Sequence, residues 1–558
     1  MLRAEYVVVG AGSAGCIVAR RLADAGHRVV LLEAGGGDRS RIIRKPGLVT
    51  LMHSVPQLKR RFDWGFYSTP QAGARQRRIP QFRGKVLGGS SSVNGMLFVR
   101  GNRRNYDDWA AAGCPGWSYS DVLDSYKRLE SWEDGAGEYR GGSGPVRVTR
   151  VPGPTAASEG FLEALARTAG VDRLDDYNGA EQEGVAHFQQ SAAGGLRYSS
   201  SVAFLDGERP AGLEVRTGVS VSRVLIENGR AIGVEIRTGG RREVEVVAAQ
   251  REVILCAGVF GSPQLLMLSG IGPADHLREH GIDVVADLPV GDNLHDHLFV
   301  PLTFSTRSGV NRGTAPYFAK SLIQEALHGN TWVSRTVFEV VGFVRSSIAG
   351  PVPDLQIHAL PWAYPSPNQD APVRHPVDKR PALTVMSTLI YPKSRGTLRL
   401  ASPDPSAAPL IDPAYLSEPD DARVLLDGVE LLRETFRSGR VAADVVELHP
   451  GPQLATRADL AADLPQRATT VYHPVGTCRM GSDERAVVDP WLRVRGVTGL
   501  RVADASIMPS ITGGNTNAPA LMIGEHAAAL IRPDGHPAPS APAEPLRPPM
   551  SRQGEQPR

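Results

Sequence analysis

The sequence predicts an α/β fold built on a parallel sheet, and three features of residues 5–33 predict it. Residues 6–9 form a short apolar run, mostly β-branched, that is typical of a strand buried on both faces of such a sheet. Gly10, Gly12 and Gly15 follow at Gly-x-Gly-x-x-Gly spacing. A helical pattern and a second apolar run come next, so strand, glycine turn, helix and strand stand in the order of a βαβ unit.

The glycine turn predicts a phosphate site. Its first glycine permits a sharp turn, the second lets backbone N–H groups approach a pyrophosphate, and the third lets helix and strand pack closely. The helix from Ser13 to Gly26 points its N-terminus, with its free N–H groups, at this turn. The second strand ends at Glu33, 18 positions after Gly15, where a carboxylate can accept hydrogen bonds from ribose hydroxyls and would repel a 2′-phosphate. This stretch therefore disfavours NADP and leaves FAD and NAD open.

The composition describes a globular protein without a strongly charged surface. The chain has 558 residues, 41% hydrophobic and 22% charged, which suffices for two large domains or one elaborated α/β domain. Its net charge of +3 comes from 62 basic and 59 acidic residues, so no global field favours nucleic acid as a partner. We expect a small-molecule substrate and no nucleic acid, and the oligomeric state stays open.

The cysteines and the first residues of the chain predict a cytoplasmic protein. The four cysteines lie far apart and form no Cys-x-x-Cys pair, so neither a disulfide framework nor a zinc site is expected. A strand that begins near residue 5 leaves no room for a signal peptide. No apolar run approaches the roughly 18 to 20 residues of a transmembrane segment.

Residues 83–101 form a second glycine-rich segment. Five small residues in a row, 88–92, can neither fill a core nor favour a regular helix, so we expect their backbone to lie close to something flat or charged. The segment contains the pattern Gly-Lys-x-x-Gly-Gly-Ser-Ser-x-x-Asn between Gly84 and Asn94. This pattern resembles the first signature of the glucose–methanol–choline (GMC) family of flavin-dependent oxidoreductases.

The resemblance covers about residues 5–532 and predicts the fold class. Residues 251–273, read as a buried strand, a glycine turn and a helix begun by Ser262 and Pro263, resemble the second GMC signature. The implied fold is α/β, with a Rossmann-like FAD-binding domain made of a parallel sheet with helices. It is interleaved in sequence with an α+β substrate domain whose sheet is mainly antiparallel.

The same resemblance predicts how the chain is divided. The expected segments are residues 1–300 as the FAD-binding region with substrate-domain insertions at about 45–80 and 102–195, residues 301–465 as mostly substrate-binding domain, residues 466–532 as the C-terminal FAD-binding and catalytic segment, and residues 533–558 as a disordered tail. The tail is rich in proline and cannot bury enough apolar surface to order itself.

The resemblance also implies which residues bind FAD. They come from the glycine turn, the acidic strand end, the 83–101 segment, a strand near residue 221, the turn at residue 258, the strand end at residues 504–505 and the segment around residue 517. The full set is Gly10, Gly12, Ser13, Gly15, Glu33, Ala34, Val86, Gly89, Ser90, Asn94, Gly95, Met96, Leu97, Val221, Gly258, Asp504, Ala505 and Asn517. Some family members attach FAD to a His just before the signature Asn. This chain has Val93 there, so we expect non-covalent FAD.

His473 and Asn515 are the candidate catalytic residues. Taken alone, a His before a Pro in a glycine-containing turn is more often a packed residue than a catalyst. In the GMC family, the His of the His-Pro-x-Gly-Thr motif faces the reactive nitrogen of the flavin and acts as a general base, with a His or Asn across the site. An imidazole titrates near 6.5 and can accept a proton from an alcohol. The amide of Asn515 can donate to the developing alkoxide without titrating.

The implied activity is FAD-dependent oxidation of a primary alcohol to an aldehyde, with electrons passed to a quinone or other acceptor. Two alternatives stay open: an alcohol oxidase that reduces oxygen to hydrogen peroxide, and a flavin-containing hydroxynitrile lyase-type enzyme. Choline would need an acidic residue or an aromatic cage, which residues 300–390 do not reveal. The loop with Asp292, His295, Asp296 and His297 could suggest a metal site, but the resemblance places it as structure near the flavin, and we expect no metal.

Overall fold

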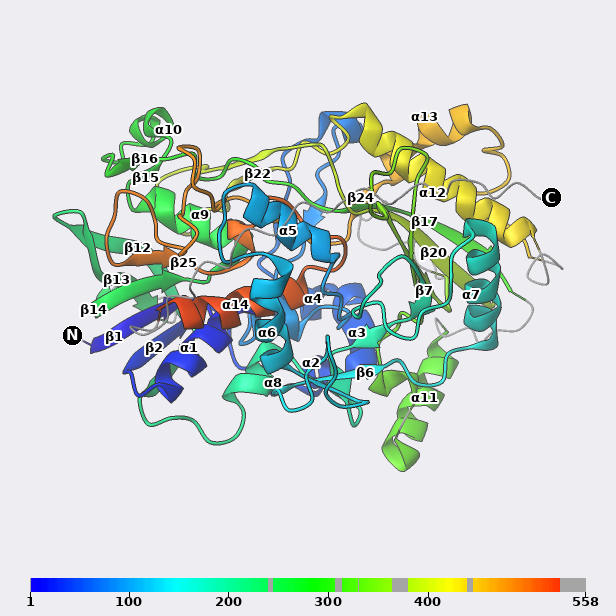
Figure 1. Ribbon diagram of the computed structural model, residues 1–558, viewed down its shortest axis with the longest axis horizontal. Helices are drawn as coiled ribbons and strands as arrows, with labels where there is room; N and C mark the ends of the chain where they lie inside the picture. The colour runs from blue at the N-terminus through cyan, green and yellow to red at the C-terminus, as the bar shows by residue number, and fades with distance from the viewer. Residues whose placement is uncertain are drawn as a thin grey trace, which may run out of the picture.

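The computed structural model of the protein describes residues 2–238, 244–306, 314–329, 331–363, 380–438 and 445–531. Two seven-stranded sheets organise these residues and lie towards opposite ends of the molecule (Figure 1). The first is mostly parallel near its centre, and the second is antiparallel. The cavity described below is lined from both.

The first sheet contains the predicted βαβ unit. Its strand order is β11-β2-β1-β14-β13-β12, with β25 paired to β14. The strands are β1 (Leu2–Val9), β2 (Val29–Glu33), β11 (Leu213–Thr217), β12 (Val219–Glu227), β13 (Arg230–Thr238), β14 (Glu245–Leu255) and β25 (Leu500–Val502). β1 lies parallel to β2 and β14, whereas β13 pairs antiparallel with β12 and β14. All of β2 and residues 6–9 of β1 are buried, as the apolar runs predict.

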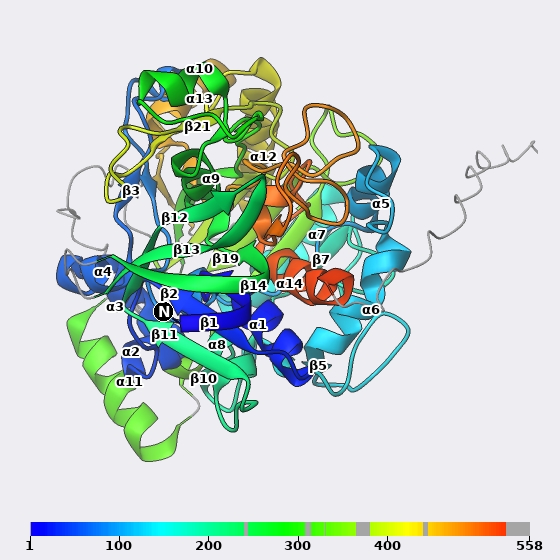
Figure 2. The same cartoon turned by 90° about the vertical axis from the view of Figure 1, so that its left-hand side faces the viewer.

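Two helices from opposite ends of the chain pack together beside this sheet. They are α1 (Gly15–Asp24) and α14 (Asn517–Ile531), which lie side by side in Figure 2. A Cβ on Gly524 of α14 would lie 2.7 Å from the carbonyl oxygen of Ala14, so a larger residue could not pack this closely. The first nucleotide-binding motif is therefore held against the C-terminal segment.

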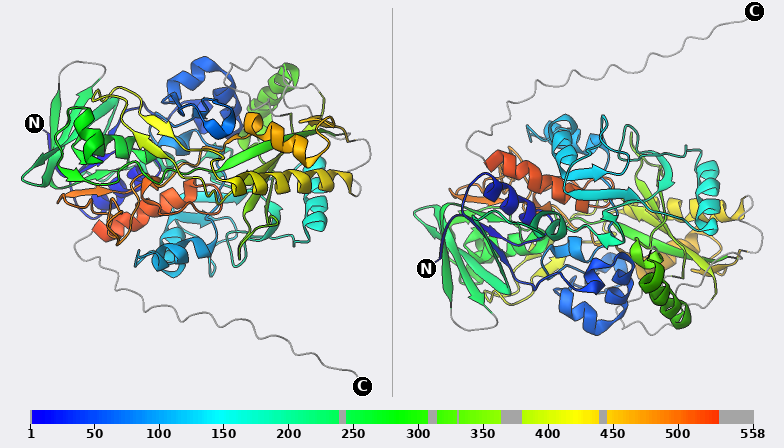
Figure 3. Two further views of the ribbon diagram at one scale, coloured as in Figure 1. Left: turned by 90° about the horizontal axis from the view of Figure 1, so that it is seen from above. Right: turned by 90° about the horizontal axis from the view of Figure 1, so that it is seen from below.

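The second sheet has the strand order β23-β17-β20-β19-β18-β7, with β24 paired to β17. All of its pairings are antiparallel. The strands are β7 (Gly184–His187), β17 (Leu298–Ser305), β18 (Val340–Val344), β19 (Leu355–Leu360), β20 (Ala382–Leu389), β23 (Glu447–His449) and β24 (Thr469–Thr470). The helices α7 (Ala156–Ala169), α12 (Pro419–Arg437) and α13 (Arg457–Arg467) lie on the side away from the first sheet (Figures 1 and 3).

The side chains of β19 alternate between the hydrophobic core of the second sheet and the cavity side. Because successive side chains of a strand point to opposite faces, Leu355, Ile357 and Ala359 pack into the core that contains α7 and α12 residues. His358 and Leu360 point the other way and line the cavity. All six residues of β19 are buried, so the strand has no solvent-facing side.

The sequence also led to predictions about membrane spans, the C-terminal tail and the domain boundaries. Within the described residues, no helix is both long and apolar enough to span a membrane. The predicted proline-rich tail, residues 533–558, lies outside the described residues. The predicted domain boundaries stay predictions.

Candidate active site

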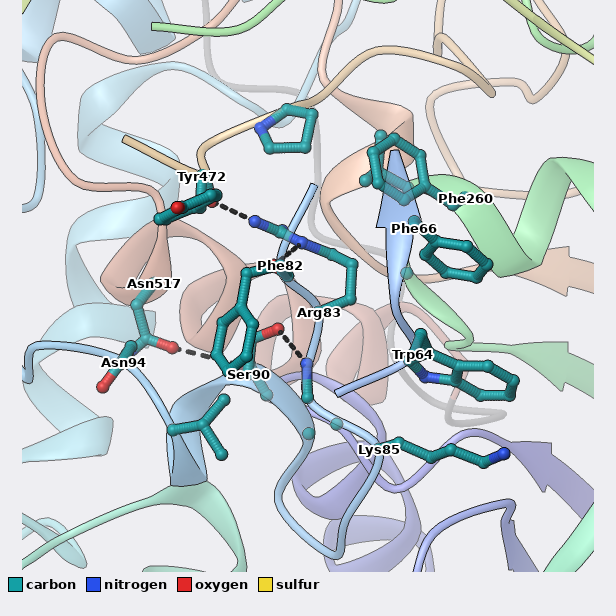
Figure 4. A pocket seen from close by; sticks show the side chains of 18 of the residues that line it. Trp64, Phe66, Phe82, Arg83, Lys85, Ser90, Asn94, Phe260, Tyr472 and Asn517 are labelled. Atoms are coloured by element: carbon teal, nitrogen blue, oxygen red, sulfur yellow. Dashed lines mark hydrogen bonds between the residues drawn. The ribbon is translucent and has the colours of Figure 1, made fainter. Parts of the chain in front are cut away.

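A cavity of about 1560 Å³ is lined by residues of both sheets. Figure 4 shows part of its lining. Pockets for small ligands occupy roughly 300–1,000 Å³. This cavity therefore has room for a dinucleotide-sized ligand together with a second small molecule. Its lining includes both candidate catalytic residues and sixteen of the eighteen residues expected at FAD, all except Gly15 and Val86.

The two glycine-rich segments meet at one end of the cavity. Gly10 has a positive φ of +96°, and a Cβ there would lie 2.5 Å from the carbonyl oxygen of Cys256. At Gly12 a Cβ would meet no protein atom nearer than 3.9 Å, whereas a Cβ on Gly89 would lie 2.8 Å from the Gly12 Cα. The backbone at Gly12 is thus open to the cavity and supported from behind, which fits close approach of a pyrophosphate.

Gly15 and Val86 lie behind this end of the cavity. A Cβ on Gly15 would come within 1.9 Å of the Gly10 carbonyl oxygen, so Gly15 permits the close packing of α1 on the turn. Val86 is 1% exposed and packs with Ile43, Val49 and Phe82 in an apolar cluster. Both support the backbone of the turn and the loop from outside the cavity.

Glu33 ends β2 at the cavity and accepts two backbone hydrogen bonds. Its Oε2 accepts from the N–H of Ala11 at 2.9 Å, and its Oε1 accepts from the N–H of Gly35 at 2.7 Å. Burial raises the pKa of Glu33 to about 7, and these two bonds oppose the rise. Each carboxylate oxygen can accept more than one hydrogen bond, so Glu33 still has acceptor capacity for ribose hydroxyls.

Asp504 joins the end of β25 to α9 (Gly258–Leu268). Its carboxylate accepts from the N–H of Gly258 at 2.9 Å, from the N–H of Ser506 at 2.8 Å, and from the Ser262 hydroxyl. The helix therefore starts at Gly258, and the expectation that Ser262 and Pro263 begin it is wrong. The positive φ of Gly258 makes the turn, and Asp504 satisfies a donor of the first helical turn.

Pro263 inside α9 ties the helix to the His-Pro-x-Gly-Thr segment. Proline has no N–H, so the carbonyl of Val259, four residues earlier, lacks its helical partner. The hydroxyl of Thr477 donates to that carbonyl at 2.6 Å. Thr477 belongs to the same motif as His473, and this bond fixes the motif to the helix.

Asn94 and Asn517 are each held by a residue from a distant part of the chain. The Oδ1 of Asn517 accepts from the Ser13 hydroxyl at 3.0 Å, a contact between residues 504 positions apart. The Oδ1 of Asn94 accepts from Arg197 at 2.7 Å and from the N–H of Met96 at 3.0 Å. Burial lowers the pKa of Arg197 to about 9. Arg197 also donates to two backbone carbonyls, a supporting role that the sequence did not indicate.

His473 and Asn515 lie in contact on the cavity lining. The Nδ2 of Asn515 is 3.2 Å from the Nε2 of His473. The N–H of His473 donates at 2.9 Å to the buried carboxylate of Asp296, which fixes the backbone. The preceding residue, Tyr472, has a φ of +66°, a conformation that costs a non-glycine residue of order 1–3 kcal/mol. Its carbonyl accepts from the guanidinium of Arg83, which points toward Tyr472 in Figure 4.

Two further residues contact this pair, and neither was predicted from the sequence to have a catalytic role. The Nδ1 of His297 is 3.1 Å from the Nδ1 of His473, with the two rings perpendicular. Gln356 of β19 donates from Nε2 to the Oδ1 of Asn515 at 3.1 Å. His297 directly precedes β17, and the first residues of β17 pair with β24. Because β24 ends three positions before His473, this pairing brings His297 next to His473.

Burial keeps these histidines neutral. It lowers the pKa of His473 well below the ordinary value, with smaller contributions from His297, His358 and Arg83. Burial also lowers the pKa of His297 to about 3, against the carbonyls of Ile390 and Thr512, and that of His358 to about 3. A neutral imidazole has one nitrogen with a free lone pair, so His473 can accept a proton at neutral pH.

The wall around His473 is apolar and aromatic. Trp332 and Trp362 lie edge to face with ring centroids 5.9 Å apart, and Phe338, Leu360 and Met386 line the same cavity. Among the described lining residues, the carboxylates are Glu33 and Asp504, which belong to the predicted cofactor-binding segments. The described wall therefore suits an uncharged organic substrate.

The loop that could suggest a metal is tied into other contacts. Asp292 pairs with Arg399, His295 Nδ1 lies 2.6 Å from the Asn293 carbonyl oxygen, and Asp296 anchors His473. Across the residues that the structure describes, no group of three or more His, Cys, Asp or Glu side chains could hold a metal ion. All four cysteines are buried free thiols, namely Cys16, Cys114, Cys256 and Cys478.

Comparison with known proteins identifies the family. Family models described as GMC oxidoreductase match residues 4–299 and residues 392–524. The chain belongs to the GMC oxidoreductase family. It is 42% identical over 547 residues to "Oxygen-dependent choline dehydrogenase" of Sinorhizobium medicae, and 39% identical over 537 residues to "Alcohol dehydrogenase [acceptor]" of Pseudomonas putida. Each alignment covers 94% of this chain and 95% of the relative.

Solved structures of the GMC type share the whole fold. Pyridoxine 4-oxidase from Mesorbium loti has a TM-score of 0.83 at 29% identity, and the match covers 95% of this chain and 99% of that one. Formate oxidase from Aspergillus oryzae RIB40 has a TM-score of 0.86 at 26% identity, with 95% and 98% covered. These findings confirm the predicted fold class.

The family assignment also confirms FAD as the cofactor and an oxidoreductase acting on CH–OH donors as the class of enzyme. The cavity fits FAD, because it has an open glycine backbone for phosphates and a carboxylate acceptor at the end of β2. It also offers the amides of Asn94 and Asn517.

Proposed function

We propose that the protein oxidises a primary alcohol to an aldehyde, with His473 as the general base, and that the electrons pass to a quinone or another acceptor. The contact of 3.2 Å between His473 Nε2 and Asn515 Nδ2, on the lining of the cavity, carries this proposal. An alcohol hydroxyl that lies against both atoms and replaces their direct contact can donate to the imidazole and accept from the amide at the same time.

His473 takes the hydroxyl proton at Nε2. An alcohol O–H is a poor acid, and its carbon releases hydride more readily as the oxygen gains alkoxide character, so a positioned base lowers the barrier. Asn515 donates from Nδ2 to the oxygen while its negative charge develops. FAD, when bound, supplies the acceptor for the hydride from the substrate carbon. Asp296 holds the backbone of His473 in place throughout.

The residues that would hold FAD come from five segments. Gly12 offers open backbone to the pyrophosphate, and Glu33 offers acceptors to the ribose. Asn94, Asp504 and Asn517 line the remaining part of the same cavity. Val93 leaves no histidine for a covalent link before Asn94, so the cofactor is bound without a covalent bond.

The substrate we favour is an uncharged aliphatic or aryl primary alcohol. The apolar wall of Phe338, Leu360 and Met386 supports it. Choline is the second candidate, since relatives carry that name and the Trp332–Trp362 pair offers aromatic faces to a trimethylammonium group.

An anaerobic screen tests this function. Purified holoprotein is mixed with aliphatic alcohols, aryl alcohols and choline, and bleaching of the flavin absorbance is recorded. We expect bleaching by at least one uncharged primary alcohol, followed by reoxidation with quinone analogues. A flavin that no alcohol bleaches would contradict the proposal and favour a lyase. Hydrogen peroxide release at the full turnover rate would replace the quinone with oxygen as the acceptor.

A further inference from the structure

The contacts of His473 belong to a longer chain of hydrogen bonds that runs from the cavity lining into the buried interior. Gln356 contacts Asn515 at 3.1 Å, Asn515 contacts His473 at 3.2 Å, His473 contacts His297 at 3.1 Å, and His297 Nε2 contacts the carbonyl oxygen of Ile390 at 2.9 Å. Gln356 and His297 are both 0% exposed. Solvent therefore does not reach these two residues, whereas His473 and Asn515 between them line the cavity.

Only one member of this chain has a fixed hydrogen-bonding role. An imidazole can carry its proton on either nitrogen, and a side-chain amide can be turned by 180°. The backbone carbonyl of Ile390 can only accept. His297 must therefore carry its proton on Nε2, because the other tautomer would bring two lone pairs together at 2.9 Å in a buried place.

The direction of every other bond follows from this end. A neutral His297 protonated on Nε2 has a lone pair on Nδ1, so His473 must donate to it from Nδ1–H. The Nε2 of His473 then carries the lone pair, which accepts from Nδ2 of Asn515 in this structure. The Oδ1 of Asn515 is left to accept from Nε2 of Gln356, which completes the chain without a mismatched pair.

We propose that the Ile390 carbonyl, acting through His297, sets the tautomer of His473, so that the lone pair of Nε2 faces the substrate side of the cavity. This inference rests on the proposed function, in which Nε2 of His473 is the base. His297 is then a positioning residue. A buried carboxylate holds the catalytic imidazole of serine proteases in its tautomer in the same way; here a neutral ring does so without adding a charge.

Nitrogen NMR on the holoprotein tests the tautomer directly. The ¹⁵N shifts of imidazole distinguish a protonated nitrogen from one with a lone pair. In protein labelled at its 14 histidines, the His473 signals are identified by their loss in the His473→Gln variant. We expect protonated Nδ1 and unprotonated Nε2 for His473, and the reverse for His297. A His473 protonated on Nε2 in the resting holoprotein would overturn the proposal.

Two substitutions of His297 test its effect on rate. In His297→Gln, Oε1 can accept from His473 while Nε2–H donates to Ile390, whereas His297→Leu can do neither. We expect His297→Leu to lower the limiting rate of anaerobic flavin reduction by about 10- to 100-fold, by analogy with the loss of partners that orient metal-binding histidines. Flavin content and alcohol affinity should be unchanged, and His297→Gln should recover most of the rate. Equal rates in the two variants would contradict the proposal.

The results of these experiments distinguish an error in the role of His297 from an error in the proposed function. If His473→Gln abolishes flavin reduction while His297→Leu keeps the wild-type rate, the proposal for His297 is wrong and the proposed function stands. If His473→Gln also keeps the wild-type rate, the proposed function itself is wrong. If His297→Leu does not fold, the NMR measurement on the native protein still decides the tautomer.

Discussion

Replacing Asn515 by leucine separates the chemistry of the site from its stability. Asn515→Leu keeps the approximate size of the side chain but removes the amide donor 3.2 Å from His473 Nε2 and the acceptor 3.1 Å from Gln356 Nε2. The first loss concerns the alkoxide that forms during reaction. The second leaves the Nε2 of Gln356 buried without this partner.

The two losses have different magnitudes. Loss of one preorganised donor to a developing oxyanion typically lowers the rate by about 10²–10³-fold. A buried polar group that loses its partner costs about 1–3 kcal/mol of stability. Replacing both partners by apolar groups is nearly neutral for stability, so the double variant Asn515→Leu/Gln356→Leu should regain the melting temperature without regaining the rate.

Stopped-flow reduction of the flavin by the best alcohol measures the first effect, and thermal unfolding measures the second. Gln57→Leu, on the exposed side of α4 (Pro56–Phe62), is the control for loss of a side-chain amide away from the cavity. A wild-type reduction rate in Asn515→Leu would refute the donor role. A double variant that recovers both rate and stability would show that Asn515 acts only through packing.

Four more predictions follow from the same site. Burial lowers the pKa of His473, and protonation of this residue would remove the base. The value of kcat/KM should therefore stay level as the pH falls from 8 to about 6.5, the ordinary pKa of histidine, and decline only at lower pH. A decline that begins near pH 7–8 in pH-rate profiles would contradict this. In Gln356→Glu the new carboxylate accepts instead of donating and turns the Asn515 amide around, so flavin reduction should slow by about 10²-fold with unchanged flavin content, and a wild-type rate would count against the role of Gln356. Gly12→Ala should lower flavin occupancy without lowering the melting temperature of the apoprotein, because the new Cβ would lie 3.9 Å from the nearest protein atom. Gly15→Ala should lower that melting temperature, because its Cβ would lie 1.9 Å from the Gly10 carbonyl oxygen. Equal effects of the two variants in calorimetry would argue against a phosphate site at Gly12. Acid denaturation should release all flavin into the supernatant, and flavin that stays with the precipitated chain would reveal a covalent bond.

The local parts of the fold could be predicted from the sequence. Strand, glycine turn, helix and acidic strand end all appear within residues 5–33, because apolar periodicity and glycine spacing act over a few residues. The start of α9 could not be predicted in the same way. Ser262 and Pro263 look like a helix start, but the actual first turn at Gly258 depends on Asp504, which is 246 positions away.

The partners of the catalytic pair were beyond sequence reasoning for a related reason. Gln356 points toward Asn515 only because β19 packs its other face on α12 and α7, and a strand buried on both faces shows no polar alternation that would mark one side. His297 stood out in the sequence only as one of several potential metal ligands. Its contact with His473 depends on the pairing of β17 with β24, 170 residues apart in the chain.

The central claim is that His473 removes the proton of the alcohol. The most direct test is the anaerobic single-turnover rate of flavin reduction in His473→Ala, with His328→Ala at the exposed end of α11 (Ala315–His328) as the matched control. We predict a rate about 10²-fold or more below that of the wild type for His473→Ala, and no change for the control. An unchanged rate in His473→Ala, with flavin fully bound, would contradict the account.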